Sequence, residues 1–169
     1  MQPGWNVPFN GGWELAAGKT TIFSLPKSFE AGRIWARTGC TRLNGAFRCA
    51  TGDCGGVLEC AQGGIQRGGQ TPASLAEFTL NGHGAQDYYD VSLVDGYNLM
   101  ISIKVQNPNN ERPGAYWCKN PNCVQDLNLI CPEALKKRGN NGAVIGCVSA
   151  CEKFKTDEYC CRGKFNTFS

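Results

Sequence analysis

Residues 49–60 read CATGDCGGVLEC and place three cysteines within twelve positions, around Asp53 and three glycines. The whole chain of 169 residues contains eleven cysteines, a density far above that of cytosolic proteins. Such a stretch can be a metal site, a redox centre or a disulfide-linked segment of a protein from an oxidising compartment. These three possibilities make different demands on the surrounding residues.

Zinc sites are typically built from CxxC pairs and histidines, and thioredoxin-like redox centres from a single CxxC. The pairs Cys49/Cys54 and Cys118/Cys123 each enclose four residues, and the sequence contains no CxxC. The one histidine, His83, stands between two glycines, which is typical of a surface loop. The pattern therefore favours disulfides and predicts neither a metal nor a cofactor.

Composition and charge exclude several classes of partner. Charged residues make up 18% of the chain and the net charge is +3, a balance that gives no support to nucleic-acid binding. The cationic run at residues 136–138 is interpreted as the solvated end of a helix. No apolar run approaches the roughly 18 residues needed to span a membrane. The opening MQPGWNVPFNGGW has neither the basic region nor the apolar core of a signal peptide. We therefore expect a secreted, extracellular protein whose signal peptide is not present in this chain.

The first two-thirds of the chain have the pattern of short strands separated by turns. Strands are expected at residues 20–25 and 33–38. In residues 75–80 the apolar even-numbered positions fall on one face, which leaves Glu77 on the other. Two more strands, at 88–94 and 99–105, are expected to form a hairpin about the turn Asp95-Gly96.

The last third of the chain has a different character. Residues 106–117 are rich in Pro, Asn and Gly, and a cysteine-dense segment follows, with one helical candidate at Pro132–Lys137. We therefore predict a mainly β protein with a β-sandwich body over residues 1–106 and a smaller disulfide-rich lobe over residues 107–169.

Several segments resemble, in order, those of the thaumatin-like proteins, the family of thaumatin, osmotin and the family-5 pathogenesis-related proteins. They are NGAFRCATGDCGGVLEC (44–60), RIWARTGC (33–40), SLAEFTLN (74–81), DYYDVSLVDGYN (87–98) and CEKFKTDEYCC (151–161). The resemblance covers almost the whole chain, and several motifs of this length together are highly specific. It implies a secreted protein whose domain I is a flattened antiparallel β-sandwich with disulfide-rich lobes beside it.

The same resemblance implies a set of disulfides. It pairs Cys40 with Cys49, Cys54 with Cys60, Cys131 with Cys147, and Cys151 with Cys160. It also accounts for the odd number of cysteines, because the remaining three match cysteines whose partners lie in the family's closing segment: Cys118, Cys123 and Cys161. We therefore expect a chain truncated at both ends, which lacks the first strand of domain I and the C-terminal segment of the lobe (domain II).

The proposed working site of the family is an acidic cleft between domain I and the disulfide-rich lobe. Matched motif by motif, four of its five charged residues correspond to Arg33, Glu77, Asp90 and Asp95. The fifth, an aspartate of the family's C-terminal segment, has no counterpart in this chain. The resemblance thus implies that these four residues bind substrate.

Glycoside hydrolysis commonly uses two carboxyl groups, one protonated and one ionised. Neighbouring carboxylates raise one another's pKa, which would keep Glu77 protonated, while Arg33 would hold a partner ionised. Glu77 and Asp95 are therefore the catalytic candidates. The same groups would bind a β-glucan without cutting it, because carboxylates accept hydrogen bonds from sugar hydroxyls and a tyrosine at 88, 89 or 97 could stack on a sugar face.

Strand parity leaves an alternative open for the two aspartates. Asp90 and Asp95 are five residues apart, so on one straight strand they would point to opposite faces. They converge only if a bulge or the Asp95-Gly96 turn redirects one of them; otherwise they are turn and edge residues. Asp53, beside Cys54, is interpreted as a turn-capping residue rather than a catalytic one.

The sequence thus predicts a secreted thaumatin-like defence protein that binds fungal cell-wall β-1,3-glucan through an acidic cleft, with antifungal activity implied by the resemblance. One alternative is a weak endo-β-1,3-glucanase, with Glu77 as the acid and Asp95 or Asp90 as nucleophile or base. Another is a protein-interaction module, such as an inhibitor of microbial hydrolases, or a fragment without activity. The expected partner is β-1,3-glucan or a related cell-wall polysaccharide, or a microbial protein; neither nucleic acid nor a membrane span is expected.

Overall fold

The computed structural model describes residues 7–106 and 118–167, and within these residues the protein is mainly β. The strands are β1 (Phe29–Trp35), β2 (Thr41–Leu43), β3 (Ala46–Arg48), β4 (Leu75–Leu80), β5 (Tyr88–Ser92), β6 (Lys136–Arg138) and β7 (Val144–Cys147). The helical elements are α1 (Ala150–Phe154) and the short 3-10 turns η1 (Pro8–Gly11), η2 (Gln62–Gly64), η3 (His83–Ala85), η4 (Leu127–Leu129), η5 (Glu133–Leu135) and η6 (Gly163–Phe165). The predicted mainly β class is confirmed.

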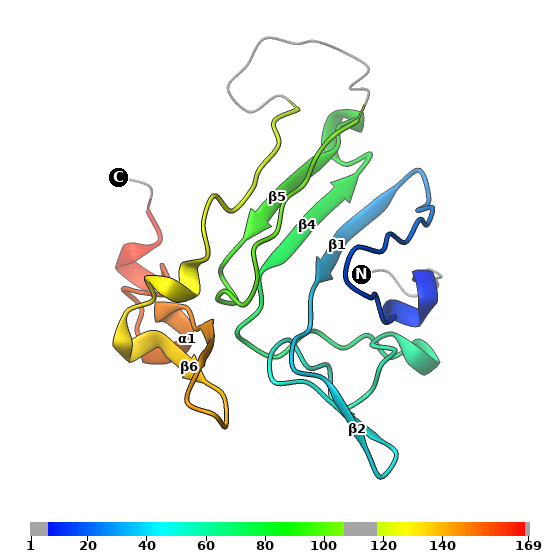
Figure 1. Ribbon diagram of the computed structural model, residues 1–169. Helices are drawn as coiled ribbons and strands as arrows, with labels where there is room; N and C mark the ends of the chain where they lie inside the picture. The colour runs from blue at the N-terminus through cyan, green and yellow to red at the C-terminus, as the bar shows by residue number, and fades with distance from the viewer. Residues whose placement is uncertain (1–6, 107–117, 168–169) are drawn as a thin grey trace.

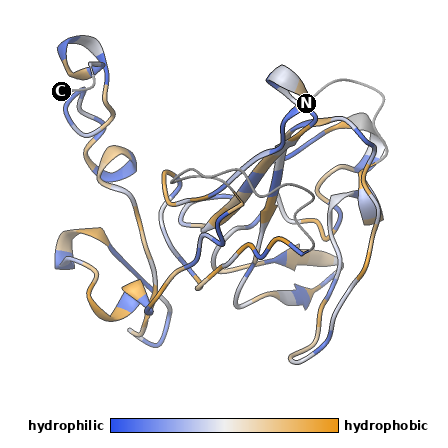
Figure 2. Cartoon of the chain, turned by 90° about the horizontal axis from the view of Figure 1, so that it is seen from above, coloured by the Kyte–Doolittle hydropathy of each residue, from blue (hydrophilic) through white to orange (hydrophobic). Residues whose placement is uncertain are grey.

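The central sheet is antiparallel, with β4 between β1 and β5 (Figure 1). Leu75 at the start of β4 lies opposite Trp35 of β1 on one side and opposite Ser92 of β5 on the other. The N-terminal segment lies on the β1 side of this sheet, and the C-terminal third of the chain lies on the β5 side (Figures 1 and 2). The sheet is therefore the frame on which both outer segments are placed.

The strand predicted at residues 75–80 is confirmed by β4, in which Leu75 and Ala76 are both buried and the other four residues are half-buried. The Phe78 ring stacks on Phe29, with centroids 5.7 Å apart, away from the face that carries Glu77. Gly32 is the Cα partner of Phe78, and a Cβ atom at this position would overlap the Phe78 ring. Glycine at position 32 therefore lets the aromatic ring cross β1 next to the register shift between Phe29 and Gly32.

Asp53 organises the cysteine-rich loop after β3. Asp53 is only 4% exposed. Its Oδ1 accepts hydrogen bonds from the backbone N–H groups of Gly55 (2.8 Å) and Gly56 (2.7 Å), and its Oδ2 accepts one from the backbone N–H of Cys49 (2.8 Å). Burial alone would raise the pKa of Asp53, but these three N–H donors and the charge of Arg48 outweigh it and lower the pKa below its ordinary value. The turn-capping interpretation of Asp53 is confirmed.

A buried asparagine joins the sheet to this loop. Asn98 is 2% exposed; its Oδ1 accepts from the N–H groups of Ser74 (3.0 Å) and Leu99 (2.9 Å), and its Nδ2 donates to Ala36 O (2.9 Å) and Thr51 Oγ1 (2.8 Å). These four bonds use the full donor and acceptor capacity of the side-chain amide. One side chain thus fixes the chain just after β1, the cysteine-rich loop and the start of β4 relative to each other.

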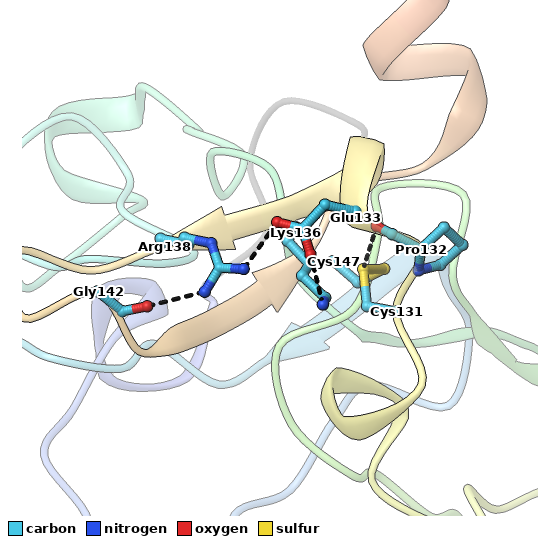
Figure 3. A network of polar contacts seen from close by, with 7 residues as sticks. All are labelled: Cys131, Pro132, Glu133, Lys136, Arg138, Gly142 and Cys147. Atoms are coloured by element: carbon cyan, nitrogen blue, oxygen red, sulfur yellow. Dashed lines mark hydrogen bonds and ion pairs between the residues drawn. A yellow bond between two sulfur atoms is a disulfide. The ribbon is translucent and has the colours of Figure 1, made fainter.

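The C-terminal part of the chain contains β6 and β7, which pair antiparallel. Tyr97 exchanges both backbone hydrogen bonds with Cys147 of β7 (2.8 and 2.7 Å), which attaches this pair of strands to the segment that follows β5. Figure 3 shows Glu133 between Lys136 and Arg138, each 2.7 Å away, beside the Cys131–Cys147 disulfide. Hydrogen bonds from Arg138 and Lys136 lower the pKa of Glu133 to about 2.

The structure contains the four disulfides that the resemblance implies: Cys40–Cys49, Cys54–Cys60, Cys131–Cys147 and Cys151–Cys160. Cys118, Cys123 and Cys161 carry free thiols. Each bridge spans 16 residues or fewer, so the bridges hold local geometry in both the body and the lobe. Within residues 7–106 and 118–167, no helix has the length and apolar character needed to cross a membrane.

Two expected strands are absent from the described residues. Residues 20–25 form no strand, and Ile22 is 89% exposed, so its side chain is not held against a sheet. Residues 99–105 do not pair with β5. The chain does turn at Leu93–Gly96, as predicted, but it then leads into the bridge between Tyr97 and Cys147. The hairpin prediction was wrong because residues 101–103 pair instead with residues 121–123. Ser102 forms a bridge with Asn122, Ile103 N–H donates to Pro121 O (2.9 Å) and Cys123 N–H donates to Ile101 O (3.0 Å).

The helix expected at Pro132–Lys137 was also wrong. The segment is a single 3-10 turn, η5, followed directly by β6. The Val148 N–H donates to Leu135 O (2.9 Å), and β7 pairs with residues 136–138, so the cationic run interpreted as a helix end is an edge of the β6–β7 ladder. Strand pairing with β7 therefore replaces the helical hydrogen bonds in this segment.

Candidate functional site

Three of the four predicted site residues form one row across the central sheet. Glu77 of β4 is the Cα partner of Arg33 in β1 and of Asp90 in β5. Residues directly opposite each other on neighbouring strands project from the same face, with Cβ atoms about 5 Å apart. The strand register therefore brings one cation and two carboxylates together, although 57 positions separate residues 33 and 90.

Arg33 and Glu77 are joined within this row. Arg33 Nε lies 2.7 Å from Glu77 Oε1, and the two side chains are 53% and 26% exposed. An ion pair this exposed adds little to the free energy of unfolding, about 0–1 kcal/mol. Its main effect is to fix the direction of the Glu77 carboxylate and to leave the second oxygen, Oε2, on the face of the sheet.

The surroundings of Asp90 in the row raise its pKa. Desolvation raises the pKa of Asp90 above its ordinary value, and the nearby negative charge of Glu77 raises it further. Because its side chain is exposed at the surface, the group stays accessible to a ligand and to solvent protons. Asp90 therefore takes up a proton at a higher pH than an ordinary aspartate does.

The row lines a shallow hollow of about 230 Å³ on this face of the sheet. Tyr88 forms one wall; it is 47% exposed and its hydroxyl donates to His83 O (3.1 Å). Thr79 lies beside it, and its Oγ1 accepts from Ala31 N–H (3.2 Å). The hollow thus offers carboxylate acceptors, a guanidinium donor and the side of an aromatic ring, the set of groups that a polyhydroxylated ligand can use.

Strand parity could have identified Thr79 from the sequence, because residues 77 and 79 alternate onto the same face. The three tyrosines predicted to stack on a sugar, at positions 88, 89 and 97, lie in three different environments. Tyr88 lines the hollow, whereas the Tyr89 hydroxyl donates to Lys119 O (2.9 Å). Tyr97 is 2% exposed, so the interpretation that it could stack on a sugar was wrong: its ring is part of the core.

Asp95 is placed apart from the other three predicted residues. It lies past the end of β5, in the turn at residues 93–96, where its backbone carbonyl accepts from Ala73 N–H (2.9 Å). It is not among the residues that line the hollow. The geometry therefore joins Arg33, Glu77 and Asp90 and leaves the role of Asp95 as a prediction. Among the described residues, no group of three or more His, Cys, Asp or Glu side chains could hold a metal ion.

The sequence matches the Thaumatin family over residues 1–169. The chain belongs to the thaumatin family. It is 48% identical over 155 residues to pathogenesis-related protein 5 of Arabidopsis thaliana, an overlap that covers 91% of this chain and 59% of that protein. It is 43% identical over 157 residues to a protein of Prunus avium named glucan endo-1,3-beta-glucosidase, covering 92% and 60%.

An osmotin-like protein of Solanum lycopersicum is 44% identical over 173 residues, covering 99% of this chain and 64% of that protein. The chain therefore spans about three-fifths of the length of these thaumatin-family relatives. The predicted resemblance is confirmed, and it agrees with the antiparallel sheets and four disulfides of the structure.

Proposed function

We propose that this chain is the glycan-binding part of a secreted defence protein of the thaumatin family and that it binds β-1,3-glucan of fungal cell walls. The observation that carries the proposal is the single cross-strand row of Arg33, Glu77 and Asp90, which lines the hollow beside Tyr88. The Prunus avium relative, whose name refers to 1,3-β-glucan, supports the choice of ligand.

The chemistry of the row suits a neutral sugar. Glu77 and Asp90 present carboxylate oxygens that accept hydrogen bonds from hydroxyl groups, and the remaining N–H groups of Arg33 donate to hydroxyl or ring oxygens. Bonds to charged groups are stronger than neutral ones, so a few contacts suffice in a hollow that is open to solvent. The exposed Tyr88 ring adds an apolar surface for the C–H face of a sugar.

A second candidate function is weak hydrolysis of the same glucan, and the raised pKa of Asp90 favours it. A general acid must keep its proton near the working pH, and the raised pKa moves the Asp90 carboxyl toward this condition. Glu77, paired with Arg33, then suits the role of nucleophile or base. This assignment exchanges the roles that the sequence suggested, where Glu77 was the acid.

Secretion and antifungal action belong to the same proposal. Four disulfides in a chain of this size suit an oxidising compartment, and the Arabidopsis thaliana relative is named for pathogenesis. Binding to the fungal wall would place the protein where a defence protein acts. If the protein does not bind glucan in the experiment below, a microbial protein becomes the alternative partner.

The binding experiment uses sedimentation with insoluble β-1,3-glucan. Wild type should sediment with the polysaccharide, and Glu77→Gln and Asp90→Asn should each weaken binding about tenfold, because a charge-assisted hydrogen bond becomes a neutral one. Glu30→Gln, an exposed acid at position 30 of β1, is the matched control and should bind as wild type does. If wild type stays in the supernatant, or if Glu77→Gln and Asp90→Asn bind as tightly as wild type and the control do, the proposed site is wrong.

The enzyme candidate is tested separately by release of reducing sugar from a soluble β-1,3-glucan. Activity that is lost in Asp90→Asn, while binding falls only about tenfold, would assign a proton-transfer role to Asp90. No release by wild type at high protein concentration would leave a binding protein without hydrolase activity.

A further inference from the structure

A second hollow, with no residue in common with the first, lies between the N-terminal segment and the end of the cysteine-rich loop. Its volume is about 370 Å³, which is within the range of small-molecule sites. The lining side chains come from residues 9–14 and 58–59. None of them belongs to the row on the central sheet, although Leu58 and Glu59 stand in the cysteine-rich stretch at residues 49–60.

Two hydrogen bonds hold the segments that line this hollow. Ala61 N–H donates to Asn10 O (2.7 Å), which joins the two segments directly, and the Arg37 side chain holds the second segment by donating from Nη2 to Leu58 O (2.8 Å). A Cβ atom at Gly12 would overlap Leu58 O, so the segments approach this closely only because residue 12 is glycine. The hollow is therefore formed by fixed backbone before any ligand arrives.

One wall of the hollow is aromatic. The rings of Phe9 and Trp13 are 5.1 Å apart and tilted by 49°, and Phe23 contacts both edge-on at 6.2 and 5.6 Å. Phe9 remains 47% exposed although it packs in this cluster. The three-ring cluster therefore supports the two lining rings and leaves an apolar surface open to solvent.

The other wall is polar and carries two carboxylates. Glu59 Oε2 accepts from Asn10 Nδ2 (3.0 Å), and Glu14 Oε1 lies 3.0 Å from Arg42 Nη2. Each contact uses one carboxylate oxygen and leaves the other for a ligand. The Asn10 amide oxygen is a further acceptor, and its second N–H a donor.

From this combination we propose that the second hollow binds one ring of a neutral oligosaccharide. A sugar ring has an apolar C–H face for the Phe9 and Trp13 rings and hydroxyl groups that donate to Glu14 and Glu59. A cationic ligand fits less well, because Arg42 already compensates one of the two carboxylates. Together, the aromatic wall and the half-used carboxylates match a ligand with both an apolar face and hydroxyl donors.

The proposal is independent of the row on the sheet and is tested with the disulfide-bonded protein. Laminarihexaose, cellohexaose and chitohexaose are each titrated into ¹⁵N-labelled protein, with choline chloride as the cationic probe. At least one hexasaccharide should shift the amide resonances of residues 9–14 and 58–61. Glu59→Gln, which can keep the bond from Asn10, should weaken this binding about tenfold.

Two further variants separate the aromatic contribution and the first site. Phe9→Leu keeps apolar volume but loses a ring face, and it should weaken binding threefold to tenfold. Glu77→Gln should leave the shifts at residues 9–14 unchanged, so failure of the sheet site and failure of this site are distinguishable. The control Glu30→Gln should match wild type.

Three results would overturn the proposal. The first is that none of the three sugars shifts residues 9–14. The second is that Glu59→Gln and Phe9→Leu, both shown to be folded by well-dispersed amide spectra, bind as tightly as wild type. The third is that choline binds in the hollow and the sugars do not, which would assign the site to a cation instead.

Discussion

The buried carboxylate of Asp53 allows a stability prediction whose size follows from its contacts. In Asp53→Asn, the amide oxygen can still accept from Gly55 and Gly56, but the amide nitrogen then faces the Cys49 N–H. An unsatisfied buried donor costs about 1–3 kcal/mol, and each bond changed from a charged to a neutral acceptor loses about 1 kcal/mol. Relief of the cost of burying a charge offsets part of this sum, so we expect a loss of about 3 kcal/mol.

Calorimetry under non-reducing conditions at pH 7 should then show a midpoint about 6–12 °C lower for Asp53→Asn than for wild type. The difference should depend on pH. Because the pKa of Asp53 is lowered in the folded protein, its stabilisation is fully present above the unfolded carboxyl pKa, near 4, and is lost as the pH falls through the lower folded value. The gap between the two proteins should therefore narrow below about pH 4.

The exposed control Glu30→Gln should change the free energy of unfolding by less than about 0.5 kcal/mol. A loss below about 1 kcal/mol for Asp53→Asn at pH 7, or a gap of equal size at pH 7 and pH 2.5, would refute the account of Asp53 given by its three backbone donors.

Three other predictions test other parts of the chain. Asn98→Asp would place a carboxylate oxygen against Ala36 O, where Nδ2 now donates, and should cost about 2–4 kcal/mol in urea unfolding at pH 7; a change below 1 kcal/mol would contradict it. The Glu133 carboxyl should titrate near pH 2 by NMR, so its ion pairs persist at pH 4 and are lost as the pH falls toward 2; titration at an ordinary value would contradict the ion-pair geometry. Denatured, unreduced protein should react with three equivalents of thiol reagent, and fewer would mean alternative pairing.

Features carried by local motifs could be predicted from the sequence. The disulfides Cys40–Cys49 and Cys54–Cys60 followed from the family resemblance of one stretch of sequence. A turn-capping role for an Asp before Cys-Gly-Gly depends only on neighbouring backbone. The face of Glu77 followed from strand parity alone. Each of these needs no knowledge of which strands pair.

Features that depend on pairing between distant segments could not be predicted. Periodicity identified residues 99–105 as an extended strand, but it did not show that Ser102 would pair with Asn122 rather than with a residue of β5. In the same way, the basic end of residues 132–137 was compatible with a helix C-terminus, whereas the structure pairs residues 136–138 with β7. The hydrogen bonds of Asn98 could not be predicted either, because its partners lie up to 62 positions away in the chain.

The register of the central sheet determines which carboxylates are available to a ligand. Asp53 has both oxygens bonded by buried backbone N–H groups, and Glu133 has both oxygens bonded by cations, so neither retains a strong acceptor position. Glu77 uses one oxygen for Arg33, and Asp90 faces it across β4 and β5. A slip of one residue in that pairing would turn Asp90 to the opposite face. On the other side of β4, the bulge beside Gly32 and the Phe78 ring that crosses it set the register of β1 and place Arg33 opposite Glu77. Gly32→Val should therefore displace Arg33 from Glu77 and weaken the proposed glucan binding, even though residue 32 offers no side chain to a sugar.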